Sequence, residues 1–224
     1  MKKKTGFIAF IRSNIIIVAL IAAVLVLSVS AKGFLSVTNI SNILLQISTY
    51  GIVAFAMTIS IIGGEFDLSI SSLMGFITLL FTNIAKKAGV FPAVLLCLAV
   101  GIVVGLLNGL MVSKIKMNAF VVTLGMMMFL KGLALTYTNG KPNNYPNDAL
   151  NAFGNGKLFG IPTITWFFLL AFLITHLVLK HTRFGRNVYA TGGNMTVAKM
   201  AGINVDFYKT MLFVILGFCT SVSA

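Results

Sequence analysis

The sequence predicts an all-α fold, a polytopic bundle of membrane-spanning helices. Of the 224 residues, 58% are hydrophobic and only 9% are charged. Such a chain has too few polar groups to cover the surface of a soluble globule. Uncharged stretches of about 20 residues, the length that crosses a bilayer as a helix, also recur along the chain. We expect six spans, the start of a seventh, and a short cytoplasmic helix after the sixth.

The first expected span covers residues 15–29, behind the basic residues Lys2, Lys3, Lys4 and Arg12. The run is long enough to cross the membrane, with a cytoplasmic start. The sequence Val29-Ser30-Ala31 also fits a signal-peptidase site, which would make the segment removable. We prefer the spanning helix, because everything after it also belongs in a membrane.

Uncharged stretches then recur at residues 40–62, 68–85, 88–113, 117–130 with a continuation to 138, and 158–179; a seventh begins at 210 and runs to 224. A basic loop lies between 179 and 210. The segment 139–157 is rich in Gly, Pro and Asn, which predicts a surface loop.

Basic residues determine the expected orientation. The net charge of +13 is concentrated in the segments between spans, which indicates topology and not a nucleic-acid partner. With the N-terminus inside, eleven lysines and arginines lie inside and five outside. Lys86 and Lys87 fall on the outer side. Either that loop is an exception, or the chain at 63–64 is a broken helix at membrane depth and its neighbours do not cross cleanly.

The stretch 61–72 holds Glu65 and Asp67, two of only four acidic residues. Carboxylates beside spanning segments normally face protein or a water-filled path. Glu65, Asp67 and Ser69 are therefore candidates for the translocation path. Asp67 and Ser69 could instead cap the next helix, although capping leaves Glu65 unexplained.

Glycines at 101, 105 and 109 predict a helix packing face. Gly101, Gly105 and Gly109 are four residues apart, so they line one stripe that a neighbouring backbone can approach closely. Asn108 lies beside this stripe and is expected to bond across helices, as a further path candidate.

Two polar residues lie in the segment that begins at 117. Thr123 is expected to bond its own helix backbone and is also a path candidate. Lys131 could extend its ammonium group to the membrane boundary, or form a buried ion pair with Glu65 or Asp67.

The loop 181–203 is expected to contain a short helix over 195–201. Asn194 is a good N-cap residue and Gly202 is placed to stop the helix. A free helix of two turns is unstable in water, so it must rest on something. Val197, Met200, Ala201 and Ile203 would form the resting face, against the chain's own membrane face or a separate protein.

The sequence indicates no metal site, disulfide or cofactor site. Cys97 and Cys219 both lie in apolar runs, and no His/Cys spacing supports metal binding. There is also no Gly-x-x-x-x-Gly-Lys nucleotide loop.

Three motifs resemble the signatures of the ribose-type ABC transporter permease family. They lie at 63–69 (Gly-Gly-Glu-Phe-Asp-Leu-Ser), at 120–125, and at 183–194 together with 198–204. The resemblance covers essentially all of residues 1–224, as one transmembrane domain that lacks its family's last helices. Ala119 stands where the family usually has proline, and Ser71 where it often has glycine.

The resemblance implies a subunit of an ATP-driven importer in the bacterial cytoplasmic membrane. Two permease copies, identical or different, would enclose a path for a ribose-, xylose- or galactose-like monosaccharide. An extracytoplasmic sugar-binding protein would deliver the sugar, and a separate ABC ATPase would bind the ATP, so the permease itself needs no cofactor. The ATPase contact would be a coupling helix with its flanking residues, Gly193, Asn194, Val197, Ala198, Met200, Ala201, Gly202 and Ile203.

Other functions remain open at this point. A similar permease could carry a nucleoside, a furanosyl signalling molecule or a branched-chain amino acid. A proton- or sodium-coupled carrier could use Glu65 and Asp67 as coupling groups. An intramembrane protease would need two carboxylates placed as an acid and a base, and only Glu65 and Asp67, two residues apart, are at hand.

Overall fold

The computed structural model describes residues 14–141 and 144–224, and the chain divides into two compact units, Met1–Leu44 and Leu45–Ala224. In the first unit, α2 (Ile15–Ser30) is followed by a turn over residues 31–36, whose Phe34 carbonyl accepts from the side-chain amide of Asn39 at 2.7 Å. The basic start of the chain, including Lys2 to Lys4 and Arg12, lies outside the described residues.

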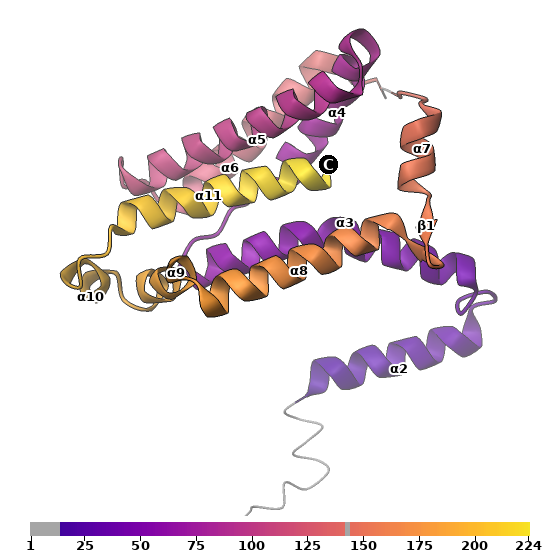
Figure 1. Ribbon diagram of the computed structural model, residues 1–224, viewed down its shortest axis with the longest axis horizontal. Coiled ribbons are helices and arrows are strands. Elements are labelled where there is room, and N and C mark those ends of the chain that lie inside the picture. The colour runs from indigo at the N-terminus through magenta and orange to yellow at the C-terminus, as the bar shows by residue number, and fades with distance from the viewer. Residues whose placement is uncertain (1–13, 142–143) are drawn as a thin grey trace, which may run out of the picture. The chain divides into compact units, whose positions relative to one another are not determined.

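The second unit is almost entirely helical (Figure 1). Its elements are α3 (Val37–Ile62), which begins in the first unit, α4 (Ile70–Ala88), α5 (Val90–Ser113), α6 (Ala119–Thr138), α7 (Asp148–Gly154), β1 (Lys157–Leu158), β2 (Ile161–Pro162), α8 (Thr163–His181), α9 (Arg183–Gly193), α10 (Met195–Met200) and α11 (Val205–Ser223). The two short strands pair antiparallel, Lys157 opposite Pro162. Every long apolar run that the sequence marked contains a helix, although the run 158–179 begins with these strands and α8 starts only at Thr163.

Two segments expected to be loops contain helices. Residues 139–157 hold α7, because the side chain of Asn147 accepts from the amide of Leu150 at 3.0 Å and caps it. Residues 183–193 form α9, which Thr182 caps by accepting from the amide of Gly185 at 3.1 Å. Because glycines lie near both ends of α9, the sequence pattern indicated a loop there and not a helix.

Among the described residues, five helices are long and apolar enough to cross a membrane: α3, α5, α6, α8 and α11. The helix α2 is shorter, with 16 residues, and α4 carries Lys86 and Lys87 in its last turn. The all-α, multi-pass class is confirmed, while the number of crossings stays a prediction.

The predicted glycine face of α5 lies against α11, and the two helices run side by side (Figure 1). A Cβ added at Gly105 would lie 2.3 Å from the carbonyl oxygen of Phe213, and one at Gly109 would lie 2.9 Å from the Cα of Thr210. Gly217 of α11 allows the same close approach from the other helix, because its added Cβ would lie 2.1 Å from the backbone oxygen of Gly101. Only glycine permits this approach.

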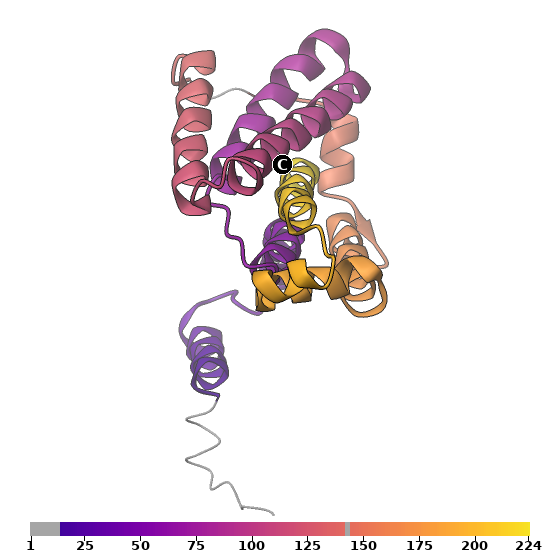
Figure 2. The same cartoon turned by 90° about the vertical axis from the view of Figure 1, so that its left-hand side faces the viewer.

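Several chain segments meet at one end of the second unit, which we call the α10 end. Here α3, α5 and α8 end, α6 and α11 begin, and α9 and α10 lie; Figure 2 views this end. One buried cluster joins Ile59 of α3, Val188 of α9 and Leu212 of α11. A second joins Val112, Val122 and Phe213 of α5, α6 and α11. The stretch 63–69 lies among these segments.

Candidate functional site

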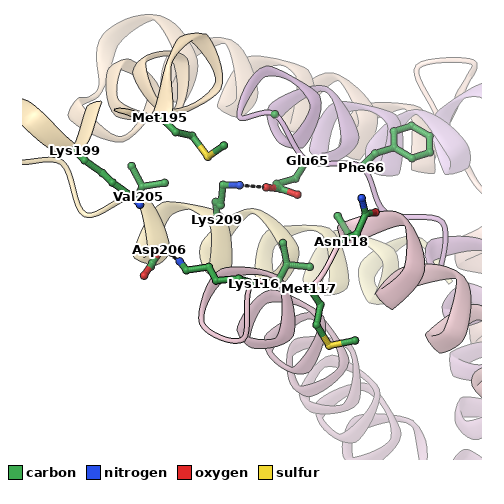
Figure 3. Close-up of a pocket in the computed structure, with 13 residues that line it drawn as sticks. Glu65, Phe66, Lys116, Met117, Asn118, Met195, Lys199, Val205, Asp206 and Lys209 are labelled. Atoms are coloured by element: carbon green, nitrogen blue, oxygen red, sulfur yellow. Dashed lines mark hydrogen bonds and ion pairs between the residues drawn. The ribbon is translucent and has the colours of Figure 1, made fainter. Parts of the chain in front are cut away.

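A cavity of about 510 Å³ opens at the α10 end (Figure 3). It is lined by the loop after α3, the link between α5 and α6, and the segments on both sides of the loop that joins α10 to α11. Its charged lining residues are two acids and three lysines: Glu65, Asp206, Lys116, Lys199 and Lys209. The charges that line the cavity therefore nearly balance.

Glu65 forms an ion pair with Lys209, as Figure 3 shows. The backbone positions the carboxylate: Gly64 takes a φ of +84°, and the amide of Glu65 donates to the oxygen of Ser60 at 2.9 Å, which ends α3. The side chains of Glu65 and Lys209 are 5% and 15% exposed. Because both are nearly buried, each charge depends on the other for stabilisation.

The predicted alternative of an ion pair between Lys131 and Glu65 or Asp67 is wrong. Lys131 is exposed on α6, whereas Lys209 of α11 reaches Glu65. The contact between α11 and the end of α3 decides this pairing, and that contact has no signature in local sequence.

A second ion pair in the cavity links Lys116 to Asp206 at 2.5 Å, with Lys114 at 4.0 Å from the same carboxylate. The side chains of Lys116 and Asp206 are 57% and 27% exposed. Water screens such a pair, so it contributes about 0–1 kcal/mol to stability.

Asp67, Ser69 and Asn108 form a buried polar cluster beside this cavity. One oxygen of Asp67 accepts from the amide of Ser69 at 2.7 Å and from its hydroxyl at 2.6 Å. The amide nitrogen of Asn108 donates to Ser69 at 3.1 Å and to the other oxygen of Asp67 at 3.4 Å. Ser69 is the N-cap residue of α4, yet its hydroxyl serves Asp67 and not the helix.

Burial raises the pKa of Asp67, which lies in the connection between α3 and α4, while the hydrogen bonds from Ser69 and Asn108 lower it. Asn108 thus joins α5 to the start of α4, as expected of a polar residue between membrane helices.

The five path candidates are all buried, none more than 6% exposed. Asp67, Ser69 and Asn108 are brought together, while Glu65 turns to α11. Thr123 donates to the backbone oxygen of Ala119 at 2.8 Å, in its own helix. These side chains are placed to hold segments together, and none lies on an exposed wall of the unit.

The short helix α10 forms where the sequence predicted it. The side chain of Asn194 accepts from the amides of Thr196 and Val197 at 3.0 and 3.1 Å, and Gly202 takes a φ of +79° after the helix. Ala198 is the α10 residue that faces the chain, at 2% exposure.

Two apolar residues of the expected resting face lie outside. Val197 is 59% and Met200 84% exposed. Ala201 is exposed as well, and Ile203 is half-buried. Val197 and Met200 therefore do not rest on the chain's own surface, which leaves a separate protein as the surface that could receive them.

Gly192 makes a close contact with the end of α3 that the sequence did not predict. A Cβ at this position would lie 1.8 Å from the backbone oxygen of Ile62 and 3.0 Å from the carbonyl carbon of Gly63. Its neighbour Gly193 has open space around it. The end of α9 therefore touches the break between α3 and α4 directly, backbone to backbone. A glycine pair in each segment was the only signal for it in the sequence.

Within the described residues, no group of three or more His, Cys, Asp or Glu side chains is arranged to hold a metal ion.

Replacing Asp67 with alanine is expected to destabilise the protein by about 1–3 kcal/mol, because Ser69 and Asn108 would lose a buried acceptor. Asp67→Asn keeps one acceptor oxygen, so its unfolding midpoint should lie between that of Asp67→Ala and that of the unsubstituted chain. Thermal unfolding of the purified protein measures both variants. An unfolding midpoint for Asp67→Ala equal to that of the unsubstituted chain would contradict the structural role of this cluster.

Comparison with known proteins gives consistent matches. Residues 39–224 match the family model described as branched-chain amino acid transport system, permease component. The chain is 34% identical over 212 residues to the ribose import permease protein RbsC of Escherichia coli K12, covering 92% of this chain and 66% of that protein.

Two further relatives show similar agreement. RbsC of Bacillus subtilis 168 is 35% identical over 207 residues, covering 89% of this chain and 63% of that protein. The L-arabinose ABC transporter permease protein AraH of Azospirillum brasilense is 32% identical over 213 residues, covering 93% and 62%. The chain thus spans at most 66% of the length of these three relatives. No solved structure matches it.

Proposed function

Because this chain belongs to the family of branched-chain amino acid transport system permease components, we propose that it is a membrane-spanning subunit of an ATP-driven importer. The family match, with ribose and arabinose permeases among its relatives, confirms the predicted resemblance. The proposed cargo is a monosaccharide. The permease would perform no chemistry itself, and a separate ABC ATPase would bind and hydrolyse the ATP.

The observation that carries this proposal is the state of α10. This helix is capped at its start and packs against the chain through Ala198, yet it exposes Val197 and Met200. Exposed apolar side chains on a short helix outside the spanning segments are typical of a protein contact. An ATPase subunit is the proposed partner, and the α10 end would then face the cytoplasm.

The charge distribution supports this orientation. The α10 end carries Lys114, Lys116, Lys180, Arg183, Arg186, Lys199 and Lys209, whereas the opposite end carries Lys86, Lys87, Lys141 and Lys157. An excess of basic residues marks the cytoplasmic side. We propose the same topology for the whole chain: the N-terminus inside, six crossings, and the start of a seventh at α11.

The contacts behind α10 suggest how movement would travel. The last turn of α9 leads directly into α10, and Gly192 touches the end of α3. Glu65, just after that end, is paired with Lys209 of α11. A displacement of α10 by a partner would therefore reach α3, α4 and α11 through direct contacts. Alternating access between two permease subunits would use these movements.

Replacing Met200 with aspartate is expected to lower the amount of ATPase subunit that co-purifies with the permease by about tenfold, because a buried unpaired charge at an interface costs more than about 1.4 kcal/mol. Co-purification from membranes that contain both subunits is the measurement. Phe159→Asp is the matched control, since Phe159 is 87% exposed in the β1–β2 turn, at the opposite end of the unit.

Equal ATPase recovery with Met200→Asp and with Phe159→Asp would contradict the proposed partner.

A transport assay separates the alternative functions. Uptake abolished by an ionophore and indifferent to ATP depletion would favour an ion-coupled carrier. ATP-dependent uptake of a nucleoside, a furanosyl signalling molecule or a branched-chain amino acid, but not of a sugar, would favour another solute.

A further inference from the structure

The helix α4 turns its apolar side inward and its polar side outward. Leu73 and Ile77 are buried, at 2% and 1% exposure, in the cluster that joins α4 to α5 and α6. Ser71, Gly75 and Thr78 lie on the opposite, exposed side. A helix that faces lipid shows the reverse arrangement, because hydroxyl groups are poorly solvated in hydrocarbon.

The exposed faces of α5 and α8, by contrast, are apolar. The exposed large side chains of α5 are Phe91, Val94, Leu95, Leu96, Ile102, Val103, Leu106, Leu107 and Leu110, and those of α8 include Phe167, Leu169, Leu170, Phe172, Leu173, Ile174 and Leu177. Such faces suit lipid tails or another apolar helix. The outer side of α4 therefore differs in kind from the outer faces of α5 and α8.

A groove of about 490 Å³ lies between α4 and α6 on this side. It is lined by Ser71, Ser72, Gly75, Phe76 and Leu79 of α4, and by Met127, Met128, Lys131 and Ala134 of α6. Within the part of the chain that the structure describes, Lys131 forms no ion pair. No hydrogen bond of the Ser71 and Ser72 hydroxyls is found there either. A Cβ added at Gly75 would meet no atom within 4 Å.

An unpaired ammonium group and free hydroxyls on one groove need water or polar ligand groups. Lys131 lies seven residues before Thr138, the end of α6, about 10 Å at helical rise, so its side chain could extend toward the membrane boundary. That explanation does not account for Ser71 and Ser72, which lie at the other end of their helix.

We propose that the α4–α6 groove forms one wall of the aqueous translocation path and takes an uncharged, polyhydroxylated solute. The proposal deepens the proposed function and rests on it. The serine hydroxyls donate and accept hydrogen bonds, and Lys131 donates them. Phe76 and the methionines offer an apolar surface to the C–H face of a sugar. The groove is open on its outer side, and a second permease subunit would close it.

This assignment differs from the sequence-based one. Glu65, Asp67, Ser69, Asn108 and Thr123 are buried between segments of the chain, so they position the wall and do not form it.

Cysteine accessibility tests the wall. Ser71→Cys and Gly75→Cys, in full-length permease whose native Cys97 and Cys219 are replaced by alanine, are expected to react with a charged, water-soluble thiol reagent in intact membranes. Leu170→Cys on α8 is the control, with Leu170 at 52% exposure. We expect both α4 variants to react at least about tenfold faster, because the thiolate forms in water and not in lipid. Reaction as slow as that of Leu170→Cys would overturn the proposal.

A second measurement tests Lys131. Lys131→Met is expected to slow uptake of D-ribose about tenfold by removing a charged donor, with ATPase co-purification unchanged, and Lys131→Arg is expected to retain most uptake. Normal uptake with Lys131→Met would overturn the role of the ammonium group.

The two proposals fail separately. Thiol labelling requires neither ATP nor sugar. If the α4 variants are labelled but uptake does not depend on ATP, the proposed path stands and the proposed ATP-driven importer is refuted. If the α4 variants are not labelled but uptake depends on ATP, the importer stands and the proposed path is refuted.

Discussion

Replacing Gly192 with alanine is expected to separate the end of α9 from the end of α3 and to abolish transport. The added Cβ would lie 1.8 Å from the backbone oxygen of Ile62, far inside van der Waals contact. Backbone atoms cannot rotate away as a flexible side chain can, so the two segments must move apart. Overpacking of this kind costs at least about 1–3 kcal/mol. The unfolding midpoint in detergent and the uptake rate in membranes measure the effect.

Gly193→Ala is the matched control for Gly192→Ala. The two glycines are neighbours in one helix, but a Cβ at Gly193 would meet no atom within 4 Å. The unfolding midpoint of Gly193→Ala should equal that of the unsubstituted chain. Any effect of a larger residue there would report on a partner and not on this chain. Equal stability of both alanine variants would refute the close contact between α9 and α3.

Removing one partner of the Glu65–Lys209 pair is expected to lower the free energy of unfolding by about 3–5 kcal/mol, since it leaves a nearly buried charge without compensation. Glu65→Gln and Lys209→Met should each show the loss, because the two side chains are only 5% and 15% exposed. The double variant should be more stable than the sum of the single losses predicts. Unfolding in denaturant of the purified single and double variants gives the coupling energy.

The exposed pair Lys116–Asp206 is the control for this cycle. Its side chains are 57% and 27% exposed, so the same cycle is expected to give about 0–1 kcal/mol. A coupling energy for Glu65 and Lys209 no larger than this value would count against the buried ion pair. It would also remove the proposed connection from the loop after α3 to α11.

The sequence by itself determined the long helices, several of their ends and the family. Apolar runs and cap residues are local features, so the positions of α10 and of its cap Asn194 followed from a few neighbouring residues. The glycine face of α5 was also local, because residues four apart share one side of a helix. Where local signals conflicted, as at the glycines of α9, the sequence indicated a loop and the helix was missed.

Only the tertiary structure decided which segments meet. Glu65 is paired with Lys209 and Asp67 is bonded to Asn108 across long stretches of chain, and Gly192, not Gly193, carries the tight contact. The outward polar side of α4 likewise became visible only when Leu73 and Ile77 were seen to pack inward. Periodicity shows that a helix has two sides, but the direction of each side is set by its neighbours, because burial is a property of the whole packing.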